Sequence, residues 1–255
     1  MGEGRFSSVR VTVGESDLWL GWAGGRGSPG RVEELAERLL RSVRTELEAR
    51  IAAEPAFLSS FSPLPLDGSA PPVVRAMLEA AAAAGVGPMA AVAGAIAQAV
   101  GGALSGELGF DELVVENGGD LWIDVQEPLT IGVYAGLSSL SGTFAVVLPP
   151  ELSPCGLACS SGTVGPSLSF GKADAAIVTA RSAAAADAWA TALGNRIRYH
   201  DDLEGAVAGV LASRTSDPDL APRGVLAVLA DRFAAAGTMV LAPLPDRFAS
   251  GSIRP

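Results

Sequence analysis

The longest uncharged stretch of the sequence runs between Glu79 and Glu107, and it constrains the fold more than any other segment. Its residues are mostly Ala and Gly, and Gly85, Gly87 and Pro88 interrupt it. A membrane span needs about 20 strongly apolar residues, whereas alanine is only marginally lipophilic. The stretch therefore predicts helices that pack closely against a sheet in a soluble domain, and we expect no contact with a membrane.

Periodic apolar residues predict strands and helices in the rest of the chain. Alternation within residues 5–22, around a Gly14-Glu15-Ser16 turn, predicts a hairpin. Apolar residues at three- and four-residue steps from Val32 to Ile51 predict an amphipathic helix. Further strands are expected at 113–116, 121–125, 130–135, 143–148, 175–180, 225–230 and 238–242, the first four as one antiparallel meander, and further helices at 183–193 and 203–211. Runs of strands with helices between them indicate an α+β fold with a largely antiparallel sheet.

The order of these elements divides the chain into two similar halves. The halves cover residues 5–150 and 151–242, although no sequence repeat relates them. We expect one domain over residues 1–255 that contains these pseudo-duplicated halves, with a loose tail at 243–255.

Charge and cysteine content exclude several classes of protein. The chain has 28 acidic and 18 basic residues and a net charge of −10, without a basic run, so a nucleic-acid partner is not expected. Two cysteines are too few for a secreted domain held by disulfides, and the N-terminus has no apolar leader segment. We therefore expect a cytoplasmic protein. Its Ala- and Gly-rich helices and four tryptophans offer packing surface for a homodimer.

Four features match functional motifs but have a simpler explanation. The single histidine, His200, cannot build a histidine-based zinc site, and we expect it at the surface. Cys155 and Cys159 have no further ligand pair beside them and read as small buried side chains. GVGPMA at 85–90 fits a dinucleotide motif but follows helix-like residues, so it indicates a glycine turn where a backbone approaches an anion. SFGK at 169–172 fits S-x-x-K but leads into a strand, not a helix.

Three segments carry richer signals. Asn117-Gly118-Gly119-Asp120 predicts either an ordinary hairpin turn or a ligand loop in which glycines let the backbone approach a ring or a phosphate. The serine- and glycine-rich segment CSSGTVG at 159–165 is either a flexible loop or a phosphate nest. Asp187 and Thr191 lie four residues apart on a predicted helix, so their oxygens share a face. This pair is either a surface hydrogen bond or a hard-oxygen pair suited to Mg²⁺.

Five segments together resemble a known family. They are GVGPMAAVAGAIA at 85–97, ENGGD at 116–120, CSSGTVG at 159–165, SLSFGKADA at 167–175 and ADAWATALGN at 186–195. They are similar to a prokaryotic family of uncharacterised function within the ApbE-like superfamily, and this resemblance runs from Arg5 to about Leu241. It implies a doubled T-fold-like unit with a mainly antiparallel sheet.

The same resemblance extends remotely to FAD:protein FMN transferases. It implies that Asn117, Gly118, Gly119 and Asp120 lie near a site for FAD or FMN, together with Ser160, Ser161, Gly162 and Thr163. It also implies that Asp187, Thr191 and the backbone carbonyl of Ala90 hold Mg²⁺.

The sequence departs from the transferase pattern at two places. Ala91 and Val92 stand where transferases carry Lys-Gly, and TVGPSLSFG at 163–171 replaces their histidine-containing segment. Pro166 stands where the family of uncharacterised function usually has a histidine. Two functions therefore stay open. One is an enzyme-like protein that binds a flavin- or nucleotide-like small molecule with Mg²⁺ for transferase or pyrophosphate chemistry. The other is a non-catalytic binding or assembly protein on the same fold.

Overall fold

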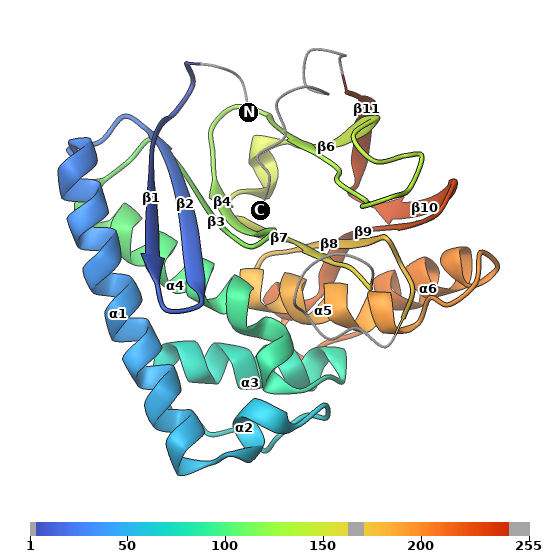
Figure 1. Ribbon diagram of the computed structural model, residues 1–255, viewed down its shortest axis with the longest axis horizontal. Helices are drawn as coiled ribbons and strands as arrows, with labels where there is room; N and C mark the ends of the chain where they lie inside the picture. Colours follow the sequence, from blue (N-terminus) through green and yellow to red (C-terminus); the bar gives the residue numbers. More distant parts are fainter. Residues whose placement is uncertain (1–3, 163–170, 245–255) are drawn as a thin grey trace.

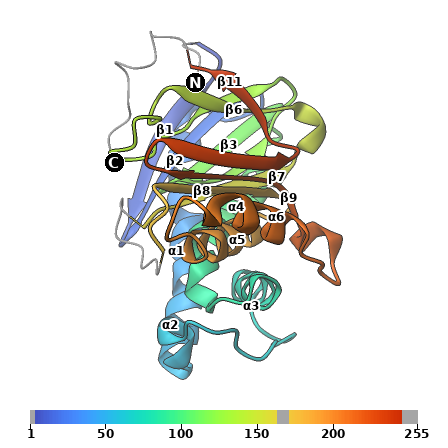
Figure 2. The same cartoon turned by 90° about the vertical axis from the view of Figure 1, so that its right-hand side faces the viewer.

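The computed structural model describes residues 4–162 and 171–244, and these residues form three layers (Figure 1). The central layer is an eight-stranded antiparallel sheet with the order β1-β2-β3-β4-β7-β8-β9-β10. Helices cover one face of this sheet, and a three-stranded sheet with the order β11-β6-β5 covers the other face (Figure 2). The α+β fold with a largely antiparallel sheet, predicted from the sequence, is confirmed.

The strands of both sheets have the following bounds: β1 Ser7–Val13, β2 Ser16–Ala23, β3 Glu112–Asn117, β4 Asp120–Asp124, β5 Leu129–Gly132, β6 Phe144–Leu148, β7 Cys155–Ser160, β8 Ala175–Ala180, β9 Pro222–Leu229, β10 Arg232–Gly237 and β11 Val240–Pro243. The helices are α1 Pro29–Ala53, α2 Ala56–Ser59, α3 Pro72–Ala84, α4 Val92–Leu108, α5 Ala183–Asn195 and α6 Asp202–Leu211. Three short 3₁₀ helices are η1 Pro88–Ala91, η2 Pro150–Leu152 and η3 Pro218–Leu220.

Each face of the central sheet has its own hydrophobic core. One core joins the sheet to the helices and contains Leu20, Leu104, Val178 and Trp189. The other joins it to the three-stranded sheet and contains Val114, Ile123 and Leu226 from the central sheet and Leu148 from the small one. Because both faces are covered, strands such as β8 are buried throughout and do not alternate.

The helix predicted within the uncharged stretch is the core helix α4. It contacts β3 and β4 of the sheet and its neighbours α1 and α5. Among the described residues, Pro88–Leu108 has the length and apolar composition of a membrane span, and 44% of its most apolar window is buried. A core helix passes the same test, and the contacts of α4 are those of a core helix. The expected absence of a membrane stays a prediction.

Three predictions about the strands need correction. Residues 130–135 and 143–148 do not continue the meander, because β4 pairs with β7 while β5 and β6 pair in the separate small sheet. The predicted serine- and glycine-rich loop begins too early, because Cys159 and Ser160 belong to β7. Residues 231–237, which separate the strands predicted at 225–230 and 238–242, contain a further strand, β10.

The two ends of the central sheet have the same element order. Hairpins β1–β2 and β3–β4 enclose α1, α3 and α4, while hairpins β7–β8 and β9–β10 enclose α5 and α6. The segment between these two sets runs from the end of β4 to the start of β7 and contains β5, β6 and the predicted boundary after residue 150. The duplication itself and the T-fold-like unit stay predictions. Residues 245–255 of the expected tail lie outside the described residues, whereas Pro243 ends β11.

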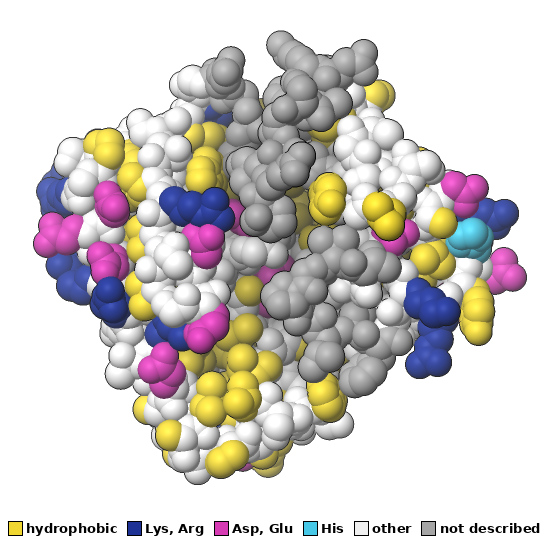
Figure 3. All heavy atoms as spheres, in the orientation of Figure 1, with side chains coloured by type: hydrophobic (Ala, Val, Ile, Leu, Met, Phe, Trp, Pro, Cys, Tyr) yellow, Lys and Arg dark blue, Asp and Glu magenta, His cyan; other side chains and the backbone are white. Residues whose placement is uncertain are grey.

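Figure 3 shows how charge and apolar side chains are distributed on one face of the molecule. Acidic and basic side chains are interspersed over α1, and apolar side chains gather at the end formed by α2 and the connector to α3. Leu58, Phe61 and Leu66 are exposed in that region.

Candidate functional site

Two of the predicted site residues meet at the first turn of α4. The carboxylate of Asp187, on α5, accepts a hydrogen bond from the backbone N–H of Gly94 at 3.0 Å and another from that of Ala93. The side-chain amide of Asn117, at the end of β3, donates to the carbonyl of Ala93 at 3.1 Å. The first N–H groups of a helix have no partner within the helix, and Asp187 satisfies two of them. The start of α4 therefore ties the β3–β4 hairpin to α5.

Close contact between backbones fixes this arrangement. A Cβ atom at Gly94 would lie 2.2 Å from the carbonyl oxygen of Ala183 and 3.0 Å from the Cβ of Asp187. A Cβ at Gly156, on β7, would lie 2.2 Å from the Cα of Ala183. The first turn of α5 is thus held between α4 and β7 at two positions that only glycine permits.

The turn from Asn117 to Asp120 is a tight hairpin connection, and Asn117 and Asp120 are paired across it. Gly118 and Gly119 have φ values of 64° and 105°, which non-glycine residues rarely adopt. Among the described residues, an added Cβ would meet nothing within 4 Å at Gly118 and only the carbonyl of Cys159 at 3.8 Å at Gly119. Conformation, and not crowding by the described part of the chain, thus requires these glycines.

Asp120 and Glu116 are acidic groups on either side of this turn. Asp120 is 8% exposed and accepts a hydrogen bond from the N–H of Cys159 at 3.2 Å, which fixes the end of β7 beside β4. The carboxylate of Glu116 accepts the N–H of Gly119 at 2.7 Å and so holds the turn. Sequence reasoning did not identify Glu116 as a site residue, although its position three residues before Gly119 is that of a turn-stabilising acceptor.

Burial shifts the pKa of each carboxyl group. Desolvation raises the pKa of Asp187 to about 7, against the two backbone hydrogen bonds that lower it. Desolvation raises the pKa of Asp120 well above its usual range, and the nearby charge of Asp187 raises it further. Burial also raises the pKa of Glu116. No Lys or Arg within residues 4–162 and 171–244 forms an ion pair with Asp120 or Asp187.

We call Asn117, Asp120, Asp187 and the first turn of α4 the acidic junction. The other predicted ligands of a metal lie on adjoining elements. Thr191 is half-buried one turn along α5 from Asp187, and Ala90 is half-buried in η1, which packs against α5. The described part of the chain contains no cluster of three or more His, Cys, Asp or Glu side chains with metal-binding geometry. A cation here would therefore need hydroxyl and carbonyl oxygens in addition to carboxylate.

The predicted phosphate-binding segment starts beside the acidic junction. Ser160 ends β7 and is buried, Ser161 is half-buried, and the N–H of exposed Gly162 bonds to the carbonyl of Ala173 at 2.9 Å. Thr163 lies outside the described residues, as do Pro166 and Ser169 of the S-x-x-K match.

The remaining candidate residues lie away from the acidic junction or are unreactive at neutral pH. The imidazole of His200 is partly exposed and lies 3.8 Å from Asp231, as expected of a surface histidine. Cys155 is buried and Cys159 half-buried, both are free thiols, and burial raises the pKa of each to about 12. Both thiols therefore stay protonated and unreactive at neutral pH. The GVGPMA segment does open a helix, since η1 begins at Pro88.

Sequence comparison places the chain among related proteins. A family model described as AbpE bacteria matches residues 1–236. A UPF0280 protein of Methanosphaerula palustris is 47% identical over 165 residues, which are 65% of this chain and 69% of that protein. A UPF0280 protein of Methanoculleus marisnigri is 46% identical over 197 residues, which are 77% of this chain and 75% of that protein.

Structural comparison gives a more distant similarity. A mutant of the flavin transferase ApbE from Vibrio cholerae aligns with a TM-score of 0.56 at 12% identity, covering 91% of this chain and 97% of that chain. A second structure of the same transferase aligns with a TM-score of 0.51, also at 12% identity, over the same shares of both chains. At this level of identity the similarity shows a shared fold, and it confirms the ApbE-like architecture.

Proposed function

Because this chain belongs to the family described as AbpE bacteria, we propose that it binds a flavin- or nucleotide-like molecule together with Mg²⁺ at the acidic junction. The observation that carries the proposal is the pair of buried carboxyl groups, Asp120 and Asp187, close enough to affect one another and without a cationic partner in the described chain. Buried charges in proteins are normally paired or coordinate a metal. The shared fold with a flavin transferase supports the class of ligand.

The donor set of the junction fits a hard divalent cation. A carboxylate has four lone-pair positions, so Asp187 can accept the N–H groups of Ala93 and Gly94 and still bind a metal. In this proposal the Asp187 carboxylate, the Thr191 hydroxyl and the Ala90 carbonyl hold Mg²⁺, which prefers oxygen ligands and retains several waters. When bound, the cation would neutralise the negative charge of a diphosphate.

The residues of the chain itself would position the organic ligand. The backbone of Gly118 and Gly119 would lie against a ring or a phosphate, and Glu116 would keep that turn in place through its bond to Gly119. Ser160 and Ser161 would offer hydroxyl groups at the end of β7, which Asp120 anchors, while Gly162 would hold the segment in place through its bond to Ala173. Thr163, outside the described residues, belongs to the same proposed segment.

A non-catalytic binding or assembly protein on the same fold is the second candidate. The observation that favours it is the position of the single histidine and the single lysine of the chain. The imidazole of His200 lies against Asp231, and the ammonium of Lys172, the single lysine of the chain, lies 6.0 Å from the ring centre of Tyr199. Neither contacts Asp120 or Asp187, so ligand binding at the junction does not by itself imply group transfer.

A thermal-shift panel tests the proposal directly. The purified protein is heated with FAD, FMN, ATP or NAD, each with and without Mg²⁺, because a ligand of the native state raises the melting temperature. We expect a shift with at least one of them that depends on Mg²⁺. No shift with any of the four would contradict the proposal. Turnover of the shifting compound would then separate an enzyme from a binding protein.

A matched pair of variants ties the shift to the junction. Asp187→Asn keeps an oxygen that accepts the N–H of Gly94 but removes the charge, so the Mg²⁺-dependent shift should disappear while the protein stays folded. Asp111→Asn, at an exposed aspartate outside the junction, should leave the shift unchanged. An unchanged shift in Asp187→Asn would remove Asp187 from the metal site. The homodimer and the cytoplasmic location stay predictions.

A further inference from the structure

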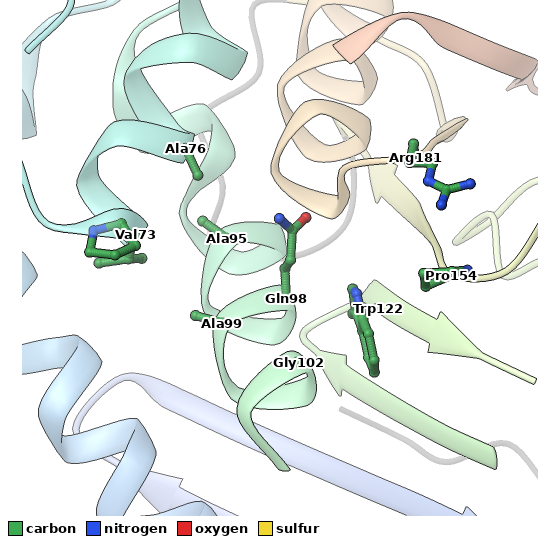
Figure 4. A pocket seen from close by; sticks show the side chains of 10 residues that line it. Val73, Ala76, Ala95, Gln98, Ala99, Gly102, Trp122, Pro154 and Arg181 are labelled. Atoms are coloured by element: carbon green, nitrogen blue, oxygen red, sulfur yellow. The ribbon is translucent and has the colours of Figure 1, made fainter. Parts of the chain in front are cut away.

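A separate hollow lies where α3, α4, β4 and the start of α5 meet (Figure 4). Its volume is about 380 Å³, within the range of small-molecule pockets. Its lining residues are mostly small and apolar: Pro72, Val73, Ala76, Ala95, Gln98, Ala99, Gly102, Trp122, Pro154 and Arg181. None of the residues predicted from the sequence to bind a flavin or a metal lines it.

The ring of Trp122 forms one wall of the hollow, and it packs directly against α4 because residue 101 is glycine. A Cβ at Gly101 would lie 2.3 Å from the indole of Trp122, so only glycine lets the ring lie this close to the helix. Gln98 lies on the side of α4 nearer Trp122, while Ala95 and Ala99 point toward α3, which carries Val73 and Ala76 (Figure 4). The flat or short apolar part of a ligand would therefore contact apolar surface on both sides of the hollow.

The two polar side chains of the hollow are both hydrogen-bond donors. The side-chain oxygen of Gln98 accepts the backbone N–H of Ala183 at 2.7 Å and the hydroxyl of Ser182 at 3.2 Å, which fixes the orientation of the amide. Its NH₂ group therefore points away from these partners and has no acceptor within residues 4–162 and 171–244. These bonds also occupy the N–H of Ala183 at the start of α5. A ligand would therefore be recognised by side chains and not by the N-terminus of that helix.

The charge of the hollow is positive. Arg181 is 43% exposed, and its contact with the exposed Asp219 is at the 4.0 Å limit of an ion pair. No acidic residue lines the hollow. Beyond the lining residues, Arg223 and the acidic Asp124 both act, together with Arg181, on the thiol of Cys155, so the positive charge of the hollow itself is that of Arg181. In a chain with a net charge of −10, this guanidinium offers a local partner for an anion.

We propose that this hollow binds a small molecule that joins a flat apolar body to a single carboxylate. The body would lie between Trp122 and the wall of α3, and the carboxylate would accept hydrogen bonds from the NH₂ group of Gln98 and the guanidinium of Arg181. This inference is independent of the acidic junction and of the function proposed for it. A molecule with about 14 heavy atoms would bind with a Kd on the order of 1 mM.

Nuclear magnetic resonance of the labelled full chain tests the proposal. Indole-3-propionate is titrated while the indole N–H signals are followed, with its neutral amide as the comparison ligand. The Trp122 signal, assigned with Trp122→Phe, should move. The Trp189 signal should not, because its N–H is bonded to the carbonyl of Leu220 in the core. The amide should bind about tenfold more weakly, since it loses a charge-assisted hydrogen bond. Equal affinity for acid and amide, or no shift of Trp122, would overturn the proposal.

Two pairs of variants locate the binding. Arg181→Gln should weaken binding of the acid about tenfold but not binding of the amide, whereas Arg38→Gln, at an exposed arginine of α1, should change neither. Gly102→Leu should fill the hollow and abolish the shift of the Trp122 signal with both the acid and the amide. Its partner is Gly106→Leu on the same helix, since a Cβ at either glycine meets nothing within 4 Å. If Gly102→Leu binds like Gly106→Leu, the ligand lies elsewhere and the proposal is wrong.

Discussion

Replacing Asp187 by Asn should make the metal-free protein more stable at neutral and alkaline pH. The pKa of Asp187 rises from 3.8 to about 7 in the folded chain, so folding favours the protonated acid. The stabilisation of the folded state that comes from this raised pKa is fully present below pH 3.8 and is lost as the pH rises through 7. A shift of about 3 pH units corresponds to about 4 kcal/mol once the group is ionised in both states. Asn stays neutral throughout, and its side-chain oxygen can still accept the N–H of Gly94.

The assay is urea unfolding of both proteins at pH 4, 5, 6, 7 and 8 in the presence of a chelator. The variant should match the wild type at pH 4 and gain on it steadily, up to about 4 kcal/mol at pH 8. Added Mg²⁺ should stabilise the wild type above pH 7 and leave the variant unchanged, because only the wild type offers a charged ligand. A stability difference that is the same at every pH would refute the assignment of a raised pKa to Asp187.

Four further substitutions test the packing that supports the site. Glu112→Gln should lower the free energy of unfolding by about 3 kcal/mol at pH 7, because Arg5 and two backbone N–H groups lower the pKa of Glu112 to about 2. This stabilisation by the ionised carboxylate is present above pH 4.5 and should vanish as pH falls through 2. Gly94→Ala should lower the free energy of unfolding by about 2 kcal/mol or more, whereas Gly102→Ala on the same helix should raise it by about 0.5 kcal/mol, both measured by urea midpoint. Asn117→Ala should cost about 1 kcal/mol, and in the proposed function it should also reduce the Mg²⁺-dependent thermal shift; full stability in this variant would show that its bond to Ala93 is not formed.

The sequence pointed to residues that the structure brings together, although it predicted the surrounding sheet less well. Asn117 and Asp187 were singled out separately, and both bond to the first turn of α4. Their partners there are the backbone groups of Ala93 and Gly94, which no side-chain pattern identifies. Gln98 and Arg181 were missed for a related reason, because their neighbours come from elements far apart in the chain.

The errors in the strands follow from how the sheet is covered. Strand β7 has the sequence CGLACS and is covered on both faces, so it lacks the alternation that marks a half-buried strand. Strand β10 is largely a run of alanines at an exposed edge, where the β-propensity of the residues is low. Strands β5 and β6 have ordinary strand patterns, but no local signal shows that they pair outside the central sheet.

The charge at the acidic junction is not needed for the structural work that Asp187 does there. Capping the first turn of α4 requires only an acceptor for the N–H groups of Ala93 and Gly94, and Asn or Ser provides one without a buried charge. A carboxylate at this position, with Asp120 beside it, instead destabilises the folded protein as pH rises from about 4 to 7. A cation bound between protein and ligand would offset that loss and stabilise the folded state by mass action. In the proposed function the junction thus combines a structural bond that any acceptor would make with a charge that a bound partner makes favourable, and this is why we propose that it binds a ligand.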